Sequence, residues 1–258
     1  MIQGLKRWLA HPATRDLSLD DPLTTQKRRD IIQGNRFLWR IYDEWYRIIA
    51  GSIPEGSGRV LELGSGAGFL GHYVPGLITS EVFTCPDIQL VLDGRRLPFS
   101  SGSLKTIAMV DVLHHVPNIR AFLTEGQRCL RSGGSVVMIE PWVSTWSRLI
   151  YGYLHHEPFE PHAKDWTFPE TGALSGANGA LPWIVFQRDR ERFEAEFSDF
   201  EIQTVRPFMP LRYLVSGGVS MRQLMPEGAF GFWRMVESGL STWPDQWSMF
   251  ALIHLRRR

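Results

Sequence analysis

The stretch RVLELGSGAGFLG, residues 59–71, decides the fold of this 258-residue chain. It opens with a short apolar run, VLEL, which is too brief for a buried helix and is followed at once by glycine, so it predicts a strand inside a sheet. Gly64, Gly66 and Gly68 follow at alternate positions, where they allow positive φ and leave no Cβ between the backbone and a ligand. A helix is expected to begin near Phe69. A strand, a glycine loop and a helix in this order are typical of a nucleotide site.

Two classes of cofactor fit such a loop. The dinucleotide fingerprint G-x-G-x-x-G falls on Gly66, Gly68 and Gly71, but this register begins two residues after the strand ends, whereas the fingerprint begins where the strand stops. Glu62, at the end of the strand, would repel a pyrophosphate and would suit a cationic ligand with an amino acid moiety. The pattern E-x-G-x-G-x-G, which starts at Glu62, resembles motif I of the class I S-adenosylmethionine-dependent methyltransferases.

This resemblance implies a set of cofactor contacts in the loop. The residues are Glu62, Gly64, Ser65, Gly66 and Gly68.

A second acidic residue extends the pattern. Residues 77–82 predict a second strand with Glu81 at its end, seventeen positions after Gly64. In dinucleotide folds an acid roughly 20 positions on, on the second strand, accepts the ribose hydroxyls. Asp87 is the rival candidate. We favour Glu81 because it ends the β-rich run.

Two further segments resemble elements of the same family. The run LVLDGRRLPF, residues 90–99, resembles D-A-x-x-L-P-F, which implies that Asp93 and Gly94 lie beside the adenine. It follows the second strand so closely that the usual intervening helix is almost absent, and we expect a thin edge of the sheet there.

The segment DVLHHVPN follows a predicted fourth strand at residues 105–110. It resembles the family segment that lines the methyl-transfer pocket. The resemblance implies that Asp111 and Val112 contact the cofactor and makes His115 a candidate to contact the substrate.

Alternation of strands and helices predicts the fold class. Residues 119–130 have helical periodicity, residues 135–139 read as a fifth strand, and RCLRSGGSVVMIE matches the family pattern R-x-L-K-P-G-G-x-L-x-I. Strands at residues 201–205 and 247–255 complete the set, the last antiparallel to the sixth. We therefore expect an α/β fold with a doubly wound, mostly parallel seven-stranded sheet, a class I methyltransferase-like variant of the Rossmann fold.

The predicted domain organisation has an N-terminal arm and helix over residues 1–50 and a methyltransferase domain over residues 51–258. The helix is expected as one element from Thr24 to Ala50. The domain carries insertions at about residues 142–199 and 207–245. The first is long and rich in aromatic residues, so we expect it to form part of the acceptor site.

Histidines in this first insertion raise the question of a metal. His155, His156 and His162 lie close to Glu157. Their spacing matches no standard helical zinc pair, and the prolines among them would break a helix, so we expect no metal. His155 and His156 join His115 as candidate catalytic bases.

Composition restricts the partners. A net charge of +1 with 21% charged residues gives no electrostatic footprint for nucleic acid. Cys85 and Cys129 show no metal-ligand spacing or disulfide framework, which indicates a reducing compartment. No run approaches the length of a membrane-spanning helix. We expect a cytoplasmic protein without an integral membrane segment, whose arm makes at most a weak peripheral contact with a membrane.

The sequence thus predicts transfer of a methyl group from S-adenosylmethionine to a small, apolar or ring-bearing acceptor. Transfer from a sulfonium is a direct displacement, so a general base is needed only for an acceptor such as a hydroxyl. Two alternatives stay open: a non-catalytic partner or scaffold of the same fold that binds S-adenosylmethionine, and a nicotinamide-dependent oxidoreductase.

Overall fold

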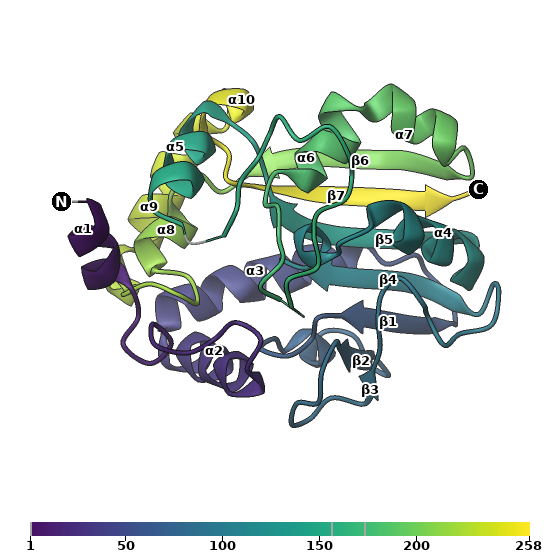
Figure 1. The fold of residues 1–258 in the computed structure, drawn as a ribbon, viewed down its shortest axis with the longest axis horizontal. Coiled ribbons are helices and arrows are strands. Elements are labelled where there is room, and N and C mark those ends of the chain that lie inside the picture. Colours follow the sequence, from purple (N-terminus) through teal and green to yellow (C-terminus); the bar gives the residue numbers. More distant parts are fainter. Residues whose placement is uncertain (1, 156, 173) are drawn as a thin grey trace.

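The computed structural model describes residues 2–155, 157–172 and 174–258 of the chain (Figure 1). Its centre is one seven-stranded sheet with the order β3-β2-β1-β4-β5-β7-β6. The first five strands pair in parallel, and β7 runs antiparallel between β5 and β6. The predicted fold class is confirmed. The strands are β1 (Arg59–Leu63), β2 (Ile78–Glu81), β3 (Leu90–Val91), β4 (Leu104–Val110), β5 (Leu130–Pro141), β6 (Phe200–Phe208) and β7 (Phe250–Arg257).

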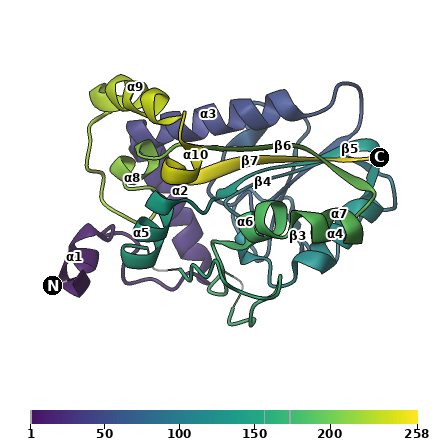
Figure 2. The same ribbon diagram turned by 90° about the horizontal axis from the view of Figure 1, so that it is seen from above.

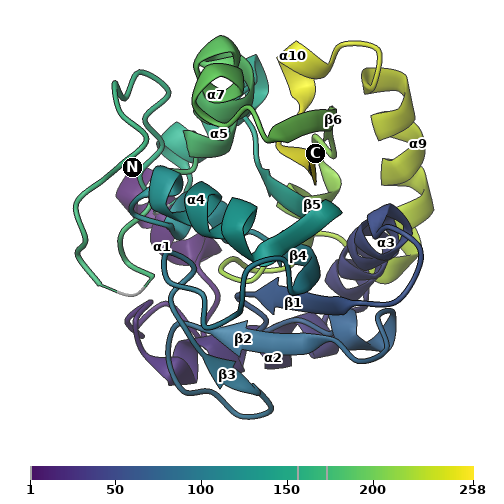
Figure 3. The same cartoon turned by 90° about the vertical axis from the view of Figure 1, so that its right-hand side faces the viewer.

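The helices form a layer on each side of this sheet (Figures 2 and 3). In the described part of the chain, none is long and apolar enough to span a membrane. The α-helices are α1 (Ile2–Leu9), α2 (Pro22–Gly34), α3 (Arg36–Ser52), α4 (Ile119–Cys129), α5 (Thr145–Tyr153), α6 (Leu181–Trp183), α7 (Arg190–Glu196), α8 (Arg212–Ser216), α9 (Phe230–Leu240) and α10 (Pro244–Trp247). Shorter turns of other helix types are η1 (Leu70–His72), η2 (Leu113–His115), η3 (Ile184–Arg188) and η4 (Glu227–Ala229).

Two hydrophobic cores fill the space between sheet and helices. Side chains on a strand point alternately to the two faces, and β5 shows this in its buried run. Val136 and Met138 belong to the core under α4, α6 and α7, whereas Val137 and Ile139 belong to the core under α3, α8 and α9. Because both faces of the central strands are covered there, the inner runs IAMV of β4 and VVMI of β5 are continuously apolar.

The predicted single helix from Thr24 to Ala50 is wrong, because the chain breaks at Asn35 into α2 and α3. The Asn35 side-chain oxygen accepts a hydrogen bond from the Leu38 N–H at 3.0 Å, which caps α3. Its amide nitrogen donates to the Ser216 carbonyl at 2.9 Å. A buried asparagine that satisfies both a helix N-terminus and a distant loop ends one helix and starts the next.

The helix expected after the glycine loop is also absent. The chain makes only the single 3₁₀ turn η1 before Gly76, which has φ of +71°. No α-helix among the described residues lies between β1 and β2. The loop therefore lacks the helix N-terminus that a dinucleotide pyrophosphate requires. The short β3 gives the thin edge that the sequence predicted.

The aromatic residues of the first insertion serve mainly as core. Trp142 and Trp166 are 2% and 0% exposed and pack in the core under α4 and α7. The indole N–H of Trp166 donates to Asp189 at 2.9 Å. The insertion is thus anchored by its own tryptophans, and its loops are held over the carboxyl ends of the strands.

Candidate active site at the carboxyl ends of the strands

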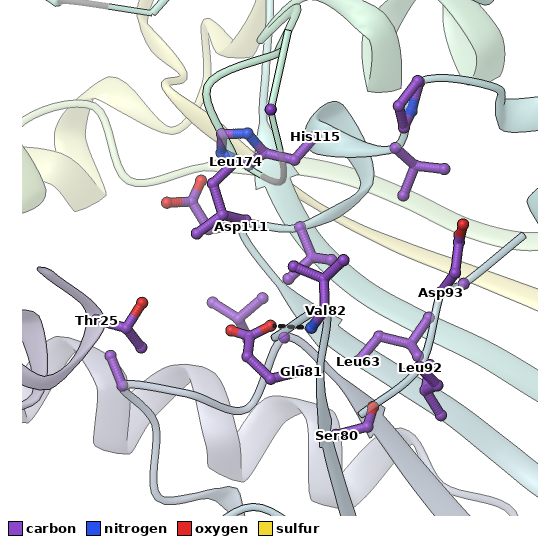
Figure 4. A pocket seen from close by; sticks show the side chains of 18 of the residues that line it. Thr25, Leu63, Ser80, Glu81, Val82, Leu92, Asp93, Asp111, His115 and Leu174 are labelled. Carbon is purple, nitrogen blue, oxygen red and sulfur yellow. Dashed lines mark hydrogen bonds between the residues drawn. The ribbon is translucent and has the colours of Figure 1, made fainter. Parts of the chain in front are cut away.

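A cavity of about 580 Å³ lies where the parallel strands end. Its wall includes one residue from the end of each of four strands: Gly64 after β1, Glu81 on β2, Asp93 after β3 and Asp111 after β4. Figure 4 shows Thr25 and Asp93 on opposite sides of this hollow, with Glu81 between them. Ligand sites in open α/β sheets occupy this position, at the carboxyl ends of the strands.

The glycine loop has the shape that the sequence predicted at its first position. Gly64 has φ of +68°, and a Cβ there would overlap the side chain of Val112. The loop is tied to β2, because the Ser65 N–H donates to the Ser80 carbonyl at 2.9 Å. Gly64 must therefore be glycine both for its backbone conformation and for the approach of the β4 loop.

Glu81 lies on the large cavity and Asp87 does not. The Glu81 carboxylate accepts a hydrogen bond from the Val82 N–H at 3.0 Å, and a Cβ on Gly66 would come within 2.8 Å of it. Burial raises the pKa of Glu81. The Asp87 side chain is 80% exposed and pairs with Arg29 at 2.7 Å. The geometry favours Glu81 as the ribose ligand, and this role stays a prediction.

Glu62 faces away from the large cavity. Side chains alternate along β1, so Leu63 lines that cavity whereas Glu62, with Ser65 and Gly68, lines a separate cavity of about 260 Å³. Glu62 is 3% exposed, and burial raises its pKa to about 7. The predicted contacts of these three residues with the cofactor stay predictions, and none of the three lines the large cavity.

Asp93 and Gly94 line the large cavity, and their predicted place beside the adenine stays a prediction. Both carboxylate oxygens of Asp93 accept hydrogen bonds from the Arg95 guanidinium, at 2.8 to 3.0 Å. Arg95 also pairs with Glu170 of the first insertion. Burial would raise the pKa of Asp93, but the hydrogen bonds from Arg95 lower it. The ion pairs from Asp93 through Arg95 to Glu170 therefore connect the end of β3 to the first insertion.

Asp111 has a strained backbone at the centre of the site. Its φ is +61°, and its N–H donates to the Ile139 carbonyl at 2.8 Å. Burial raises the pKa of its carboxyl to about 6. Asp111 lines the large cavity together with Val112, and it also lines a small cavity of about 20 Å³ beside Glu157. Positive φ in a residue other than glycine is costly and is often found at functional sites.

Glu140, at the end of β5, holds the loop that carries the histidine pair. It is 0% exposed, and its carboxylate accepts hydrogen bonds from the N–H groups of Val112 at 2.9 Å and Leu113 at 2.7 Å. Its other oxygen lies 2.8 Å from Nδ1 of His114. Burial would lower the pKa of His114, but hydrogen bonds to Glu140 and Glu157 raise it well above its usual value.

The predicted catalytic histidines separate in space. His115 lines the large cavity, with its Nδ1 3.2 Å from the Gly176 carbonyl, and burial lowers its pKa to about 4. His155 lines two smaller cavities and not the large one, and its Nδ1 lies 3.8 Å from Glu157. His156 lies outside the described residues. The geometry favours His115 over His155 as the histidine that contacts an acceptor.

Sequence reasoning missed the contribution of α2 to this site. Arg28 and Thr25 on this helix line the large cavity. The Nε atom of Arg28 is buried and has no hydrogen-bond partner among the described residues. Arg28 also lines a neighbouring cavity of about 470 Å³. No motif could have singled it out, because it lies on a helix of ordinary composition more than thirty residues before the glycine loop.

Comparisons with known proteins agree with this fold. Residues 61–138 match the model of a methyltransferase domain family. The solved structure of geranyl diphosphate C-methyltransferase from Streptomyces coelicolor A3(2) is 15% identical, with a TM-score of 0.54 over 97% of this chain and 91% of that chain. A geranyl diphosphate methyltransferase solved with S-adenosylmethionine is 14% identical, with a TM-score of 0.53 over 86% of this chain and 87% of that chain. A comparison with curated proteins found no match.

The sheet order and the match to the methyltransferase domain define one class of enzyme. Residues 61–138 match a methyltransferase domain and the sheet has the class I methyltransferase order, which agrees with the activity expected from the sequence, methyl transfer from S-adenosylmethionine. An enzyme of this class takes its methyl group from S-adenosylmethionine.

We expect Glu81→Gln to weaken binding of S-adenosylhomocysteine about ten- to a hundredfold. A carboxylate that accepts two ribose hydroxyls makes hydrogen bonds worth about 1.5–3 kcal/mol each, and the amide keeps the shape without the charge. Titration calorimetry measures the change, with Asp87→Asn as the matched control. An effect of Asp87→Asn larger than that of Glu81→Gln would show that Asp87 is the ribose ligand.

The stability of the ligand-free protein should depend on pH through Glu62. Its pKa is raised from 4.5 to about 7 by burial, with the neighbouring carboxylate of Glu81 adding to the effect. The native state therefore binds the proton more tightly than the unfolded chain, so the stability from this group is full below pH 4.5 and falls as the pH rises to about 7. Above that pH, Glu62→Gln should be more stable than the wild type by about 3 kcal/mol, at about 1.4 kcal/mol per pH unit.

Urea unfolding at about pH 5 and about pH 8 measures this difference. The exposed Glu55→Gln serves as the control and should show no such dependence. A Glu62→Gln variant whose stability relative to the wild type is the same at both pH values would contradict the assignment.

Proposed function

We propose that this enzyme transfers a methyl group from S-adenosylmethionine to a small, apolar or ring-bearing acceptor inside the large cavity. The observation that carries the proposal is the set of polar groups around this cavity, with a carboxylate at the end of each of β2, β3 and β4 and the Gly64 turn at the end of β1. The volume of about 580 Å³ lies in the range of small-molecule sites, roughly 300–1,000 Å³.

The residues of the cavity fit the parts of S-adenosylmethionine in one orientation. Asp93 and Gly94 lie at the side suited to the adenine, and Glu81 lies between them and α2, where a ribose would sit. Arg28, on the α2 side, offers a cation to the carboxylate of the amino acid moiety. Gly64 leaves room for the ligand next to the backbone. When bound, the cofactor supplies an electrophilic methyl group on a sulfonium.

The acceptor is proposed to enter beside His115, under the loop of the first insertion. Glu170, Thr171, Gly172 and Leu174 of this loop line the large cavity, so the insertion forms part of its wall. Asp20 holds the loop, because its carboxylate accepts hydrogen bonds from the N–H groups of residues 174 and 175. The part of the wall proposed to face an acceptor therefore comes from both the loop after β4 and the first insertion.

The geranyl diphosphate methyltransferases that share the fold support a small organic acceptor. Direct displacement needs alignment of the acceptor atom with the methyl group and exclusion of water, and the buried loop after β4 is placed to provide both. His115 is the residue proposed to contact the acceptor.

The remaining expectations from the sequence are proposed in the same way. We propose an arm and helical region over residues 1–50 and a catalytic domain over residues 51–258. Cys85 and Cys129 are buried free thiols, which supports a reducing, cytoplasmic location. Trp8 is 60% exposed next to Lys6 and Arg7, which supports a weak contact of α1 with a membrane surface.

The proposed function predicts that S-adenosylhomocysteine binds and NADH does not. A ligand that binds only the native state raises its melting temperature by mass action. Differential scanning calorimetry with each ligand in excess makes the comparison. A raised melting temperature with NADH and none with S-adenosylhomocysteine would refute the proposal.

Arg28→Met should weaken binding of S-adenosylhomocysteine about tenfold or more. The substitution removes a charged donor and keeps the aliphatic stem, and a hydrogen bond to a charged group is worth about 1.5–3 kcal/mol. Lys27→Met is the matched control, since the Lys27 side chain is only partly buried and pairs weakly with Asp30, at 3.5 Å. Equal affinities of the two variants would place the carboxylate of the ligand elsewhere.

A further inference from the structure

We propose that His114, His115 and Glu157 form a binding site for a divalent transition-metal ion of the zinc type, beside the methyl-transfer cavity. The site joins the loop after β4 to the first insertion. The spacing of the histidines within that insertion had led us to expect no metal. Binding of the ion is independent of the proposed function; only its role toward the acceptor rests on that function.

The three side chains converge on one point. One ligand atom from each lies within 4.8 Å of the others. Nε2 of His114 is 3.5 Å from a carboxylate oxygen of Glu157, and Nε2 of His115 is 3.8 Å from the other oxygen. Zinc bonds to nitrogen and oxygen are about 2.0–2.2 Å long, so the ligand atoms of a tetrahedral site lie roughly 3.3–3.5 Å apart. The two distances to Glu157 are within about 0.5 Å of that spacing, and the two histidine nitrogens, at most 4.8 Å apart, would need to approach by up to about 1.5 Å.

Nε2 of each ring faces Glu157, and a metal ion would replace the proton that Nε2 of His114 shares with this carboxylate. Nδ1 of His114 is 2.8 Å from the Glu140 carboxylate, and Nδ1 of His115 is 3.2 Å from the Gly176 carbonyl. Both partners are acceptors, so each Nδ1 carries the proton. In the neutral ring, the lone pair is then on Nε2, which is the atom that faces Glu157. Metal-binding histidines typically donate their second N–H to a carboxylate or a backbone carbonyl in this way.

The types of ligand select the class of metal. Two imidazoles and one carboxylate suit zinc, iron, cobalt or nickel, whereas calcium and magnesium prefer sets made of oxygen alone. Three protein ligands also leave at least one coordination position open, as in catalytic zinc sites. The side chains of His114 and Glu157 are 1% and 11% exposed, so water competes little for the ligands.

The position of the site beside the large cavity would allow a bound ion to act on the acceptor. His115 lines the large cavity, while Glu157 and Asp111 line the small cavity next to it. An ion held here would present its open position to an acceptor in the large cavity. It would bind an oxygen of that acceptor and favour its deprotonated form. The acceptor class implied by this arrangement is a small molecule with a hydroxyl or carboxylate group close to the methylated atom.

Cobalt(II) chloride is the probe for this site, because cobalt replaces zinc and absorbs visible light when bound by a few nitrogen and oxygen ligands. The full chain, first freed of metal with a chelator, is titrated with cobalt. We expect one equivalent to bind with intense visible bands. Glu157→Gln and His115→Ala should each weaken binding at least about a hundredfold, since loss of an outer-shell partner alone costs about 10–100-fold.

Two controls make the test decisive. His162→Ala removes an exposed histidine of the same insertion and should bind cobalt as the wild type does. The melting temperature and the S-adenosylhomocysteine affinity of Glu157→Gln show whether the variant is folded. Because cobalt binding is measured without S-adenosylhomocysteine, a failure of the metal proposal can be told apart from a failure of the methyltransferase proposal. The proposal is overturned if the wild type shows no visible cobalt bands, or if the wild type, Glu157→Gln and His115→Ala bind cobalt equally.

Discussion

The site depends on one buried carboxylate, Glu140, at the end of β5. It is fully buried and accepts hydrogen bonds from two backbone N–H groups and one imidazole of the loop after β4. Hydrogen bonds to a charged group contribute about 1.5–3 kcal/mol each, and an unpaired charge at this depth would cost several kcal/mol. The loop is therefore fixed to the central sheet. Asp111, the residue directly before this loop, keeps its positive φ because the contacts around it hold the backbone in that conformation.

The hydrogen bonds of Glu140 fix one loop that contacts both the large cavity and the first insertion. On one side, the fixed loop places Val112 against Gly64, which closes the large cavity, the proposed cofactor site, at the ends of β1 and β4. On the other side, it directs His114 and His115 toward Glu157 of the first insertion. A single carboxylate on the rigid sheet thus positions both a wall of the proposed cofactor site and the histidines proposed to face an acceptor, and catalysis depends on such fixed geometry.

The sequence predicted the parts of the site that follow directly from strand ends. Glu81, Asp93 and Asp111 each come at or just after the end of a strand, so a parallel sheet gathers them at one edge. It could not predict contacts made by residues far apart in the chain, such as Arg28 from α2. The break at Asn35 depends on a hydrogen bond to Ser216 that no local pattern reveals. In the same way, Glu157 meets a histidine pair more than forty positions earlier, so spacing within the insertion gave no sign of a metal site.

The most direct test of the account is a crystal structure of the protein with S-adenosylhomocysteine. The central claim is that the cofactor occupies the large cavity, with its adenine toward Asp93, its ribose at Glu81 and its carboxylate toward Arg28. Electron density for the ligand in that cavity, in that orientation, is the predicted result. Density in the smaller cavity lined by Glu62 and Gly68, or a reversed ligand with its adenine at α2, would contradict the account.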